Sequence, residues 1–252
     1  DLTGSAIYSM SLVSLMIGFS SMPALTGYVL LGSGITALGA FILWERAQAS
    51  PILDMSLLCS NRAFAWSNVA AFIHYSATFS ISFLLSMYLQ VVKGLSPSQA
   101  GLILVTQPAV MTLLSPVAGR LSDRIEPRIM ASAGMAVTAM GLAFLSFTGE
   151  RAGTLELVSC LAFIGLGFAL FSSPNTNAVM SSVDRSDYGV ASSVISTMRI
   201  TGQAFSMGIV LVLFSLFIGR IAITPQTGAA FMTAMHTGFL FFCVICIPGI
   251  FA

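Results

Sequence analysis

Seven long stretches without a charged residue make up most of this chain, and they limit the folds that it can adopt. A helix needs about 20 apolar residues to cross the hydrocarbon core of a bilayer. All seven stretches reach that length, and the first is long enough for two helices. They cover residues 2–44, 63–92, 94–119, 129–149, 157–183, 200–219 and 221–252. The chain is therefore expected to cross a membrane eight times.

The amino-acid composition agrees with a membrane protein. Hydrophobic residues make up 56% of the chain and charged residues 8%, whereas soluble domains contain about 25% charged residues. The mean hydropathy is +0.94. The apolar stretches are continuous, while the strands of a membrane barrel alternate apolar and polar residues. We therefore predict an all-α, polytopic membrane protein, and the net charge of +1 gives no sign of a nucleic-acid partner.

The eight helices can be placed from the apolar stretches and their interruptions. Ser20, Ser21 and Pro23 interrupt the first stretch, and such residues favour a turn. The predicted helices lie near 4–21, 25–44, 64–91, 98–118, 129–148, 157–178, 188–218 and 229–250. Two helices thus occupy residues 1–46, and six occupy residues 63–252.

The connection between these two parts, residues 47–62, mixes apolar and polar side chains. The segment from Pro51 to Leu58 has the composition of a helix that lies along the membrane surface. A cytoplasmic linker with a few apolar contacts explains the same pattern. Both interpretations stay open at this point.

Three arginines within one ten-residue loop, 119–128, predict the orientation of the chain. Cytoplasmic loops carry an excess of Lys and Arg because basic groups are poorly translocated. If this loop is cytoplasmic, six arginines lie inside and three basic residues lie outside. The inner set is Arg46, Arg62, Arg120, Arg124, Arg128 and Arg185, and the outer set is Lys93, Arg151 and Arg220. We therefore expect a plasma-membrane protein with both ends of this segment in the cytoplasm.

The same loop resembles the signature loop of the major facilitator superfamily, whose form is Gly-x-Leu-x-Asp-Arg-x-Gly-Arg-basic between two spans. Glu126 and Pro127 stand where that family has Gly and Arg. The matching positions are Gly119, Leu121, Asp123, Arg124 and Arg128. Such a degenerate copy is similar to the one in the C-terminal half of these transporters.

Other segments extend the resemblance over nearly the whole chain. The stretches 88–90, 94–102 and 165–174 resemble the first turn and the fourth helix of that half, and 45–62 resembles the linker of the fourteen-spanner drug:proton antiporters. Members of that branch carry two extra helices between two six-helix halves. The resemblance implies a secondary active transporter that uses a proton gradient and no cofactor to export small hydrophobic or cationic compounds. It also implies that an N-terminal six-helix half belongs to the same protein.

A polar stripe on the seventh predicted helix contains the strongest candidate for the transport path. It comprises Ser192, Ser196, Arg199, Gln203 and Ser206, at steps of four, three, four and three residues. Lipid offers no hydrogen-bond partners, so such a stripe is expected to face protein or water. Arg199 is the charged residue expected to be buried, and together with Gln203 it is predicted to line the path. The alternative is that Arg199 extends to the cytoplasmic headgroups.

Gln107, Asn175 and His74 are further candidates for the substrate path. Gln107 precedes Pro108 and Asn175 follows Pro174, and breaks of this kind expose backbone groups at transporter sites. Hydrogen bonding between packed helices is the alternative for all three, and for His74 a packing role is preferred over a proton relay. No Asp or Glu falls within a predicted span, so a coupling carboxylate is expected in the N-terminal half.

For the loop motif, we expect a conformational role or a role in anchoring the topology. Asp123 is expected to pair with Arg124, with Arg120 or with a helix N-terminus, which attracts negative charge. In family terms, Gly119, Asp123, Arg124 and Arg128 then stabilise one access state.

Three other functions are alternatives to drug export. A metabolite transporter for a sugar or an organic anion would use Arg199 as the anion contact. A membrane receptor or a membrane enzyme is the alternative of a different class. The sequence contains no HExxH, P-loop or Gly-x-Ser-x-Gly pattern, so neither an enzyme nor a metal site is expected.

Overall fold

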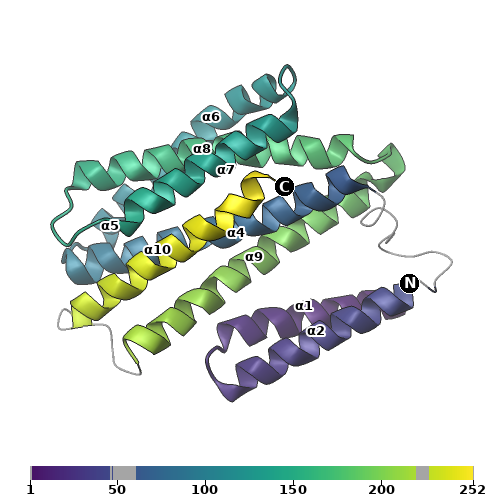
Figure 1. Ribbon diagram of the computed structural model, residues 1–252, viewed down its shortest axis with the longest axis horizontal. Helices are drawn as coiled ribbons and strands as arrows, with labels where there is room; N and C mark the ends of the chain where they lie inside the picture. The colour runs from purple at the N-terminus through teal and green to yellow at the C-terminus, as the bar shows by residue number, and fades with distance from the viewer. Residues whose placement is uncertain (1, 46, 48–60, 220–226, 252) are drawn as a thin grey trace.

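A computed structural model describes residues 2–45, 47, 61–219 and 227–251, and this part of the chain is helical with no strand (Figure 1). Eight helical spans follow one another, and one of them is divided by a break. The elements are α1 (Leu2–Ser20), α2 (Leu25–Glu45), α4 (Arg62–Met87), η1 (Tyr88–Val92), α5 (Pro97–Leu104), α6 (Thr106–Ser122), α7 (Pro127–Ser146), α8 (Thr154–Ser181), η2 (Arg185–Asp187), α9 (Tyr188–Phe217) and α10 (Gly228–Ile250). The predicted all-α class is confirmed.

The lengths of the helices fit a polytopic membrane protein. In the described part of the chain, seven helical segments are long and apolar enough to cross a bilayer, and α1 has a shorter apolar stretch, Thr3–Phe19. That stretch still falls within the range of about 17–25 residues that spans hydrocarbon. The first predicted turn is also correct, because α1 ends at Ser20 and α2 begins at Leu25.

The helix predicted at 98–118 corresponds to one spanning segment, Pro97–Ser122, with a local irregularity at Val105 between α5 and α6. Pro108 has no N–H group, so the carbonyl of Leu104, four residues earlier, lacks its helical hydrogen bond. The backbone at Val105 keeps helical dihedral angles, φ −62° and ψ −18°. Gln107 lies in the first turn of α6, beside this missing bond.

The helix predicted at 64–91 ends in a π-helical turn, η1, that the sequence analysis did not predict. The backbone N–H of Lys93 donates to the carbonyl of Tyr88 at 3.1 Å, which is the wider spacing of a π-helix. The Tyr88 ring is fully buried, and its hydroxyl donates to the carbonyl of Gly149 at 2.8 Å. This bond ties the end of α4 to the loop between α7 and α8.

Helix α4 lies at the centre of the six-helix part and packs against α9, α10, α8 and α7 (Figure 1). Helices α1 and α2 form an antiparallel hairpin at one side, with α1 against α9. At the beginning of α4, the Asn61 side chain accepts a hydrogen bond from the N–H of Phe64 and donates one to the carbonyl of Ser182. This cap holds the start of α4 beside the end of α8.

Small residues bring α7 and α8 into close contact. A Cβ atom on Gly134 would lie 2.5 Å from the backbone nitrogen of Phe171, and one on Gly167 would lie 2.5 Å from the hydroxyl of Thr138. Close backbone approach of this kind is how helices associate in membranes, where the hydrophobic effect does not drive them together. Gly134 and Thr138 therefore pack α7 against α8, whereas Gly32 on α2 has nothing within 4 Å of its added Cβ.

The predicted connection at 47–62 lies largely outside the described residues. Asn61 caps α4 and Arg62 begins it, so the helix starts slightly earlier than predicted. The choice between a surface helix and a linker for this segment stays a prediction.

Candidate functional site

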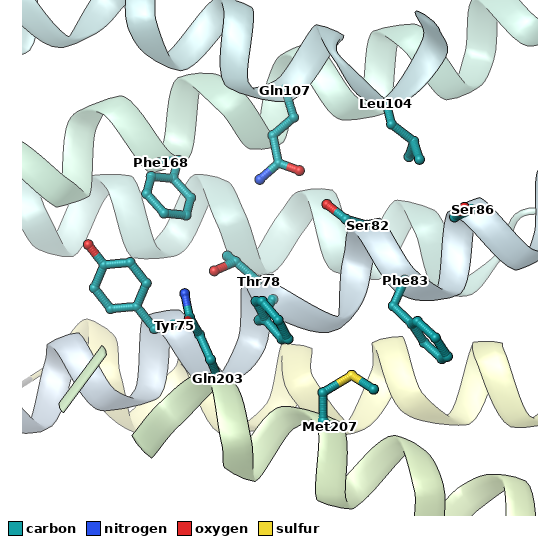
Figure 2. A pocket seen from close by; sticks show the side chains of 11 residues that line it. Tyr75, Thr78, Ser82, Phe83, Ser86, Leu104, Gln107, Phe168, Gln203 and Met207 are labelled. Atoms are coloured by element: carbon teal, nitrogen blue, oxygen red, sulfur yellow. The ribbon is translucent and has the colours of Figure 1, made fainter. Parts of the chain in front are cut away.

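A cavity of about 630 Å³, here called the central cavity, opens between α4, α5, α6, α8 and α9. Figure 2 shows its lining side chains converging from these helices. They are Tyr75, Thr78, Phe79, Ser82, Phe83, Ser86, Leu104, Gln107, Phe168, Gln203 and Met207. Its volume lies within the range of about 300–1,000 Å³ that small-molecule sites occupy.

Helix α4 supplies most of the wall through two rows of residues at four-residue spacing. One row is polar and comprises Thr78, Ser82 and Ser86; the other is aromatic and comprises Tyr75, Phe79 and Phe83. Residues four apart lie on the same side of a helix, so α4 presents both rows to the cavity. The wall is therefore apolar with hydroxyl groups at intervals.

Gln107 and Gln203 enter the central cavity from opposite sides, one from α6 and the other from α9 (Figure 2). Gln107 is 9% exposed, and α8 approaches its backbone closely, since a Cβ on Gly165 would lie 2.6 Å from the Gln107 carbonyl oxygen. Among the described residues, neither carboxamide has a hydrogen-bond partner. Each amide offers two donors and an acceptor, so the pair can bind a polar group inside the cavity.

The lining contains no residue with a formal charge among those that the structure describes. At one end, the rings of Tyr75 and Phe168 lie 5.7 Å apart at 70°, an edge-to-face arrangement that aromatic pairs favour. Apolar walls with a few polar groups bind ligands by shape and fix their orientation by hydrogen bonds. The site suits a partly aromatic molecule that is uncharged or carries a delocalised charge.

Arg199 lies at the margin of this site and is exposed, which contradicts the expectation that it is buried. Its guanidinium carbon lies 6.0 Å from the centre of the Tyr75 ring, at the limit of a cation–π contact. Among the charged residues that the structure describes, Glu45 at the end of α2 is buried, at 2% exposure. The prediction failed because hydropathy identifies a span but not the face of the helix that neighbouring helices cover.

The polar stripe on α9 is divided between different surroundings. Gln203 lines the central cavity, whereas Ser206 is fully buried and its hydroxyl accepts a hydrogen bond from the Ser80 N–H at 3.1 Å. Ser192 is exposed like Arg199. The polar stripe on α9 therefore contributes both to helix packing and to the lining of the central cavity.

His74 lies behind the cavity wall and is fully buried. Its ring stacks on Phe171 with centres 4.0 Å apart. The Thr138 hydroxyl donates to the carbonyl of Gly134, so it accepts from Nε2–H of His74 at 3.3 Å. Within the described residues, Nδ1 has no partner. This is the geometry of a neutral imidazole packed between helices.

Asn175 is buried away from the central cavity. It lines a narrow cleft between α4, α7 and α8 together with Ser67 and Arg128. The structure therefore brings Gln107 and Gln203 together and separates them from Asn175 and His74. Participation of any of these residues in transport stays a prediction.

The loop motif borders a second cavity, of about 720 Å³, between the ends of α6 and α8. Gly119, Arg120 and Asp123 line it with a group of hydroxyl and amide side chains, namely Ser115, Ser122, Ser172, Ser173, Thr176 and Asn177. Arg124 and Arg128 are exposed and do not line this cavity. Asp123 forms no ion pair with any described residue, so the expected pairing with Arg120 or Arg124 is absent from this part of the chain.

The residues that the structure describes contain no group of three or more His, Cys, Asp or Glu side chains that could hold a metal ion.

Comparison with known proteins agrees with this architecture. The family model for the Major Facilitator Superfamily matches residues 2–207 and 67–252. The chain belongs to the major facilitator superfamily. The resemblance to this family, first seen in the loop at 119–128, is thereby confirmed.

Relatives within the superfamily include exporters and a vitamin transporter. The chain is 31% identical to the riboflavin transporter RibZ of Clostridioides difficile over 69% of its length and 38% of that protein. It is 27% identical to the multidrug resistance protein Stp of Mycobacterium tuberculosis, over 83% of its length and 40% of that protein. It is 30% identical to the cephamycin export protein CmcT of Amycolatopsis lactamdurans, over 84% of its length and 45% of that protein. The chain thus spans less than half the length of these relatives.

Most residues of the central-cavity wall were not predicted from the sequence. Aromatic residues such as Phe79 and Phe168 look the same in sequence whether they face lipid or a cavity. One signal was available, because Thr78, Ser82 and Ser86 recur every four residues in an apolar helix, and such a row needs protein or water beside it.

Proposed function

We propose that this chain forms the C-terminal part of a proton-coupled exporter of small, mainly hydrophobic compounds, and that the central cavity is its share of the substrate site. One observation carries the proposal: the carboxamides of Gln107 and Gln203 enter an uncharged, aromatic-lined cavity without partners among the described residues. A polar group that is kept free in an apolar cavity is suited to binding a ligand.

The proposed partners follow from the length of the relatives and from the position of the cavity. The chain spans 40% of one relative that is a multidrug resistance protein, which supports an additional six-helix half. In the alternating-access mechanism, two such halves rock against each other around a central site. The second half then covers the cavity and supplies the carboxylate that binds the coupling proton.

We place the transporter in the plasma membrane, with the 119–128 loop and both ends of this segment in the cytoplasm. The excess of arginine in that loop supports this orientation. No cofactor is required, because the proton gradient supplies the energy and the lipid bilayer is the solvent for the helices.

A specific observation also supports a second candidate, transport of a neutral metabolite. The relative at 31% identity is a riboflavin transporter, and the Tyr75–Phe168 pair with two carboxamides suits a planar, hydrogen-bonding ligand. Transport of an organic anion receives less support, because Arg199 does not line the central cavity.

Reconstitution of the full-length protein into proteoliposomes tests both candidates. Ethidium and riboflavin efflux are measured with and without an imposed pH gradient, together with proton flux by an internal pH dye. The exporter predicts that ethidium efflux depends on the gradient and is accompanied by opposite proton flux. Riboflavin efflux without ethidium efflux supports the metabolite candidate, and gradient-independent flux of both compounds contradicts proton coupling.

A further inference from the structure

A third cavity, of about 380 Å³, lies between α1, α4 and α9, and is here called the α1 vestibule. It is lined by Met16, Ile17, Phe79, Ile200, Gln203, Ala204 and Met207. Three of these residues, Phe79, Gln203 and Met207, also line the central cavity. The two cavities are therefore neighbours that share one wall.

Helix α1 is fixed against α9 on both sides of the vestibule. Toward the beginning of α9, the hydroxyl of Tyr8 donates to that of Thr197 at 3.0 Å. Further along, the rings of Phe19 and Phe205 lie 5.4 Å apart, edge to face. A Cβ on Gly208 would lie 2.9 Å from the Phe19 ring, so the helices meet closely there. The vestibule is thus a defined opening between two contacts of one helix pair.

The lining of the vestibule is apolar except at its inner wall. Gln203 is the single polar side chain among the lining residues that the structure describes, and its amide also reaches the central cavity. Phe79 and Gln203 lie in the middle third of α4 and α9, which places the opening at the depth of the lipid tails. Ile17 and Ile200 are exposed at its outer edge. The opening suits an apolar molecule dissolved in the bilayer.

The shared wall consists of side chains that can move. Phe79 is 42% exposed, so few contacts restrain its ring. Met207 has three rotatable bonds and adapts to irregular spaces. Rotamer changes of an exposed side chain such as Phe79 take picoseconds to nanoseconds, and Met207 is half-buried. Movement of these two side chains can therefore open the separation between the two cavities without any movement of a helix.

From this continuity we infer that the α1 vestibule admits hydrophobic substrates from the lipid bilayer to the central cavity, with Phe79 and Met207 as the gate. The inference rests on the proposed function in using the central cavity as the substrate site. It also gives a function to the α1–α2 hairpin, because Met16 and Ile17 form the outer wall. The occupant is the apolar part of a substrate, and a lipid acyl chain is the competing occupant that the experiment must exclude.

Filling the vestibule tests this inference. Ile17→Trp adds bulk to the lining, whereas Val13→Trp adds the same side chain one turn earlier on α1, at an exposed position that lines neither cavity. Both variants are made in the full-length protein in proteoliposomes. The lipophilic dye rhodamine 6G, whose positive charge is delocalised over its aromatic rings, is the probe, and its association rate constant, dissociation rate constant and initial transport rate are measured.

We expect Ile17→Trp to lower the association and dissociation rate constants of the dye about tenfold while kcat stays unchanged, since a filled entry path slows movement in both directions and leaves the affinity of the central cavity as it is. Val13→Trp is expected to behave as the wild type. Equal association rate constants in all three proteins contradict the inference and leave a lipid chain as the occupant. A lower kcat with an unchanged association rate constant also contradicts it, because the vestibule would then affect the conformational change and not entry.

Binding separates this inference from the proposed function. If the wild-type protein binds the dye but transports nothing under any gradient, the exporter proposal fails. The vestibule is then judged by the association rate constants alone, and a tenfold difference between Ile17→Trp and Val13→Trp still supports it. Equal association rate constants overturn it whether or not transport occurs.

Discussion

The six-helix part has a tightly packed side, at α7 and α8, and an open side, at α5 and α6. In the spanning segment of α7, 50% of the residues are buried within the chain, against 11% in the segment formed by α5 and α6. The first side is held by glycines and a threonine that let α7 and α8 touch. The second presents the central cavity and polar groups without partners. If the central cavity is the substrate site, as proposed, stability and substrate binding depend on different faces, and substitutions on the two faces should have different consequences.

The largest effect is expected on the packed side, from Gly134→Leu. The added side chain meets the Phe171 backbone at 2.5 Å from its first atom, and backbone cannot move aside cheaply. Overpacking of this kind costs about 3 kcal/mol, so little folded protein should remain in a thermal-stability assay in detergent. The matched control is Gly32→Leu, which has open space. Equal melting temperatures would show that the α7–α8 contact is not essential.

On the open side, Arg199→Ala should abolish transport and leave the fold intact. A cation at this depth is a functional candidate because it is expensive to keep in a membrane. Its contact with Tyr75 is exposed and is worth about 0.5–1 kcal/mol, so the melting temperature should hardly change. Efflux from proteoliposomes measures the first effect. Wild-type efflux by this variant would mean that Arg199 only extends to the headgroups.

A smaller loss is expected from Gln203→Leu, which keeps the volume of the side chain and removes its amide. Loss of one hydrogen bond to substrate should lower kcat/KM about tenfold, equivalent to about 1.4 kcal/mol. Gln90→Leu is the control, because that amide bonds Ser86 on its own helix and lies outside the lining. If both variants lose activity equally, the central cavity has no special role.

The smallest effect is expected from His74→Phe, at the boundary between the two sides. The stack on Phe171 can be kept, and the only described side-chain bond that is lost is the 3.3 Å contact with Thr138. Such bonds contribute about 0.6 kcal/mol in membrane proteins. Efflux measured across a range of pH should match the wild type. A changed pH dependence would restore a proton-relay role for His74.

The sequence predicted the helices well because each span needs a long apolar stretch, which is visible without knowing its neighbours. It did not reveal the local irregularity at Val105, where Pro108 leaves the carbonyl of Leu104 without its helical hydrogen bond. It failed for Arg199 and for the cavity wall. Lipid and protein interior are equally apolar, so a sequence does not show which face of a span is covered.

For the candidate site, sequence reasoning selected Gln107 and Gln203 because an amide in an apolar helix needs a partner. Their convergence on one cavity depends on the packing of α6, α8 and α9, which no local pattern contains. Asn175 satisfied the same criterion and yet lies in a separate cleft. Polarity identified candidates, and only the arrangement of the helices distinguished them.

The central claim is that the open side contains the substrate site. Protection of the Ser82→Cys thiol from alkylation by bound substrate tests this claim most directly. Ser82→Cys, introduced into the full-length protein after its other cysteines are replaced, places a thiol on the exposed part of the cavity wall. The measurement is its rate of alkylation by a maleimide with and without saturating substrate. We predict that substrate slows alkylation at this position and leaves Leu113→Cys, on the exposed surface of α6, unaffected. Equal rates at Ser82→Cys with and without bound substrate would contradict the account.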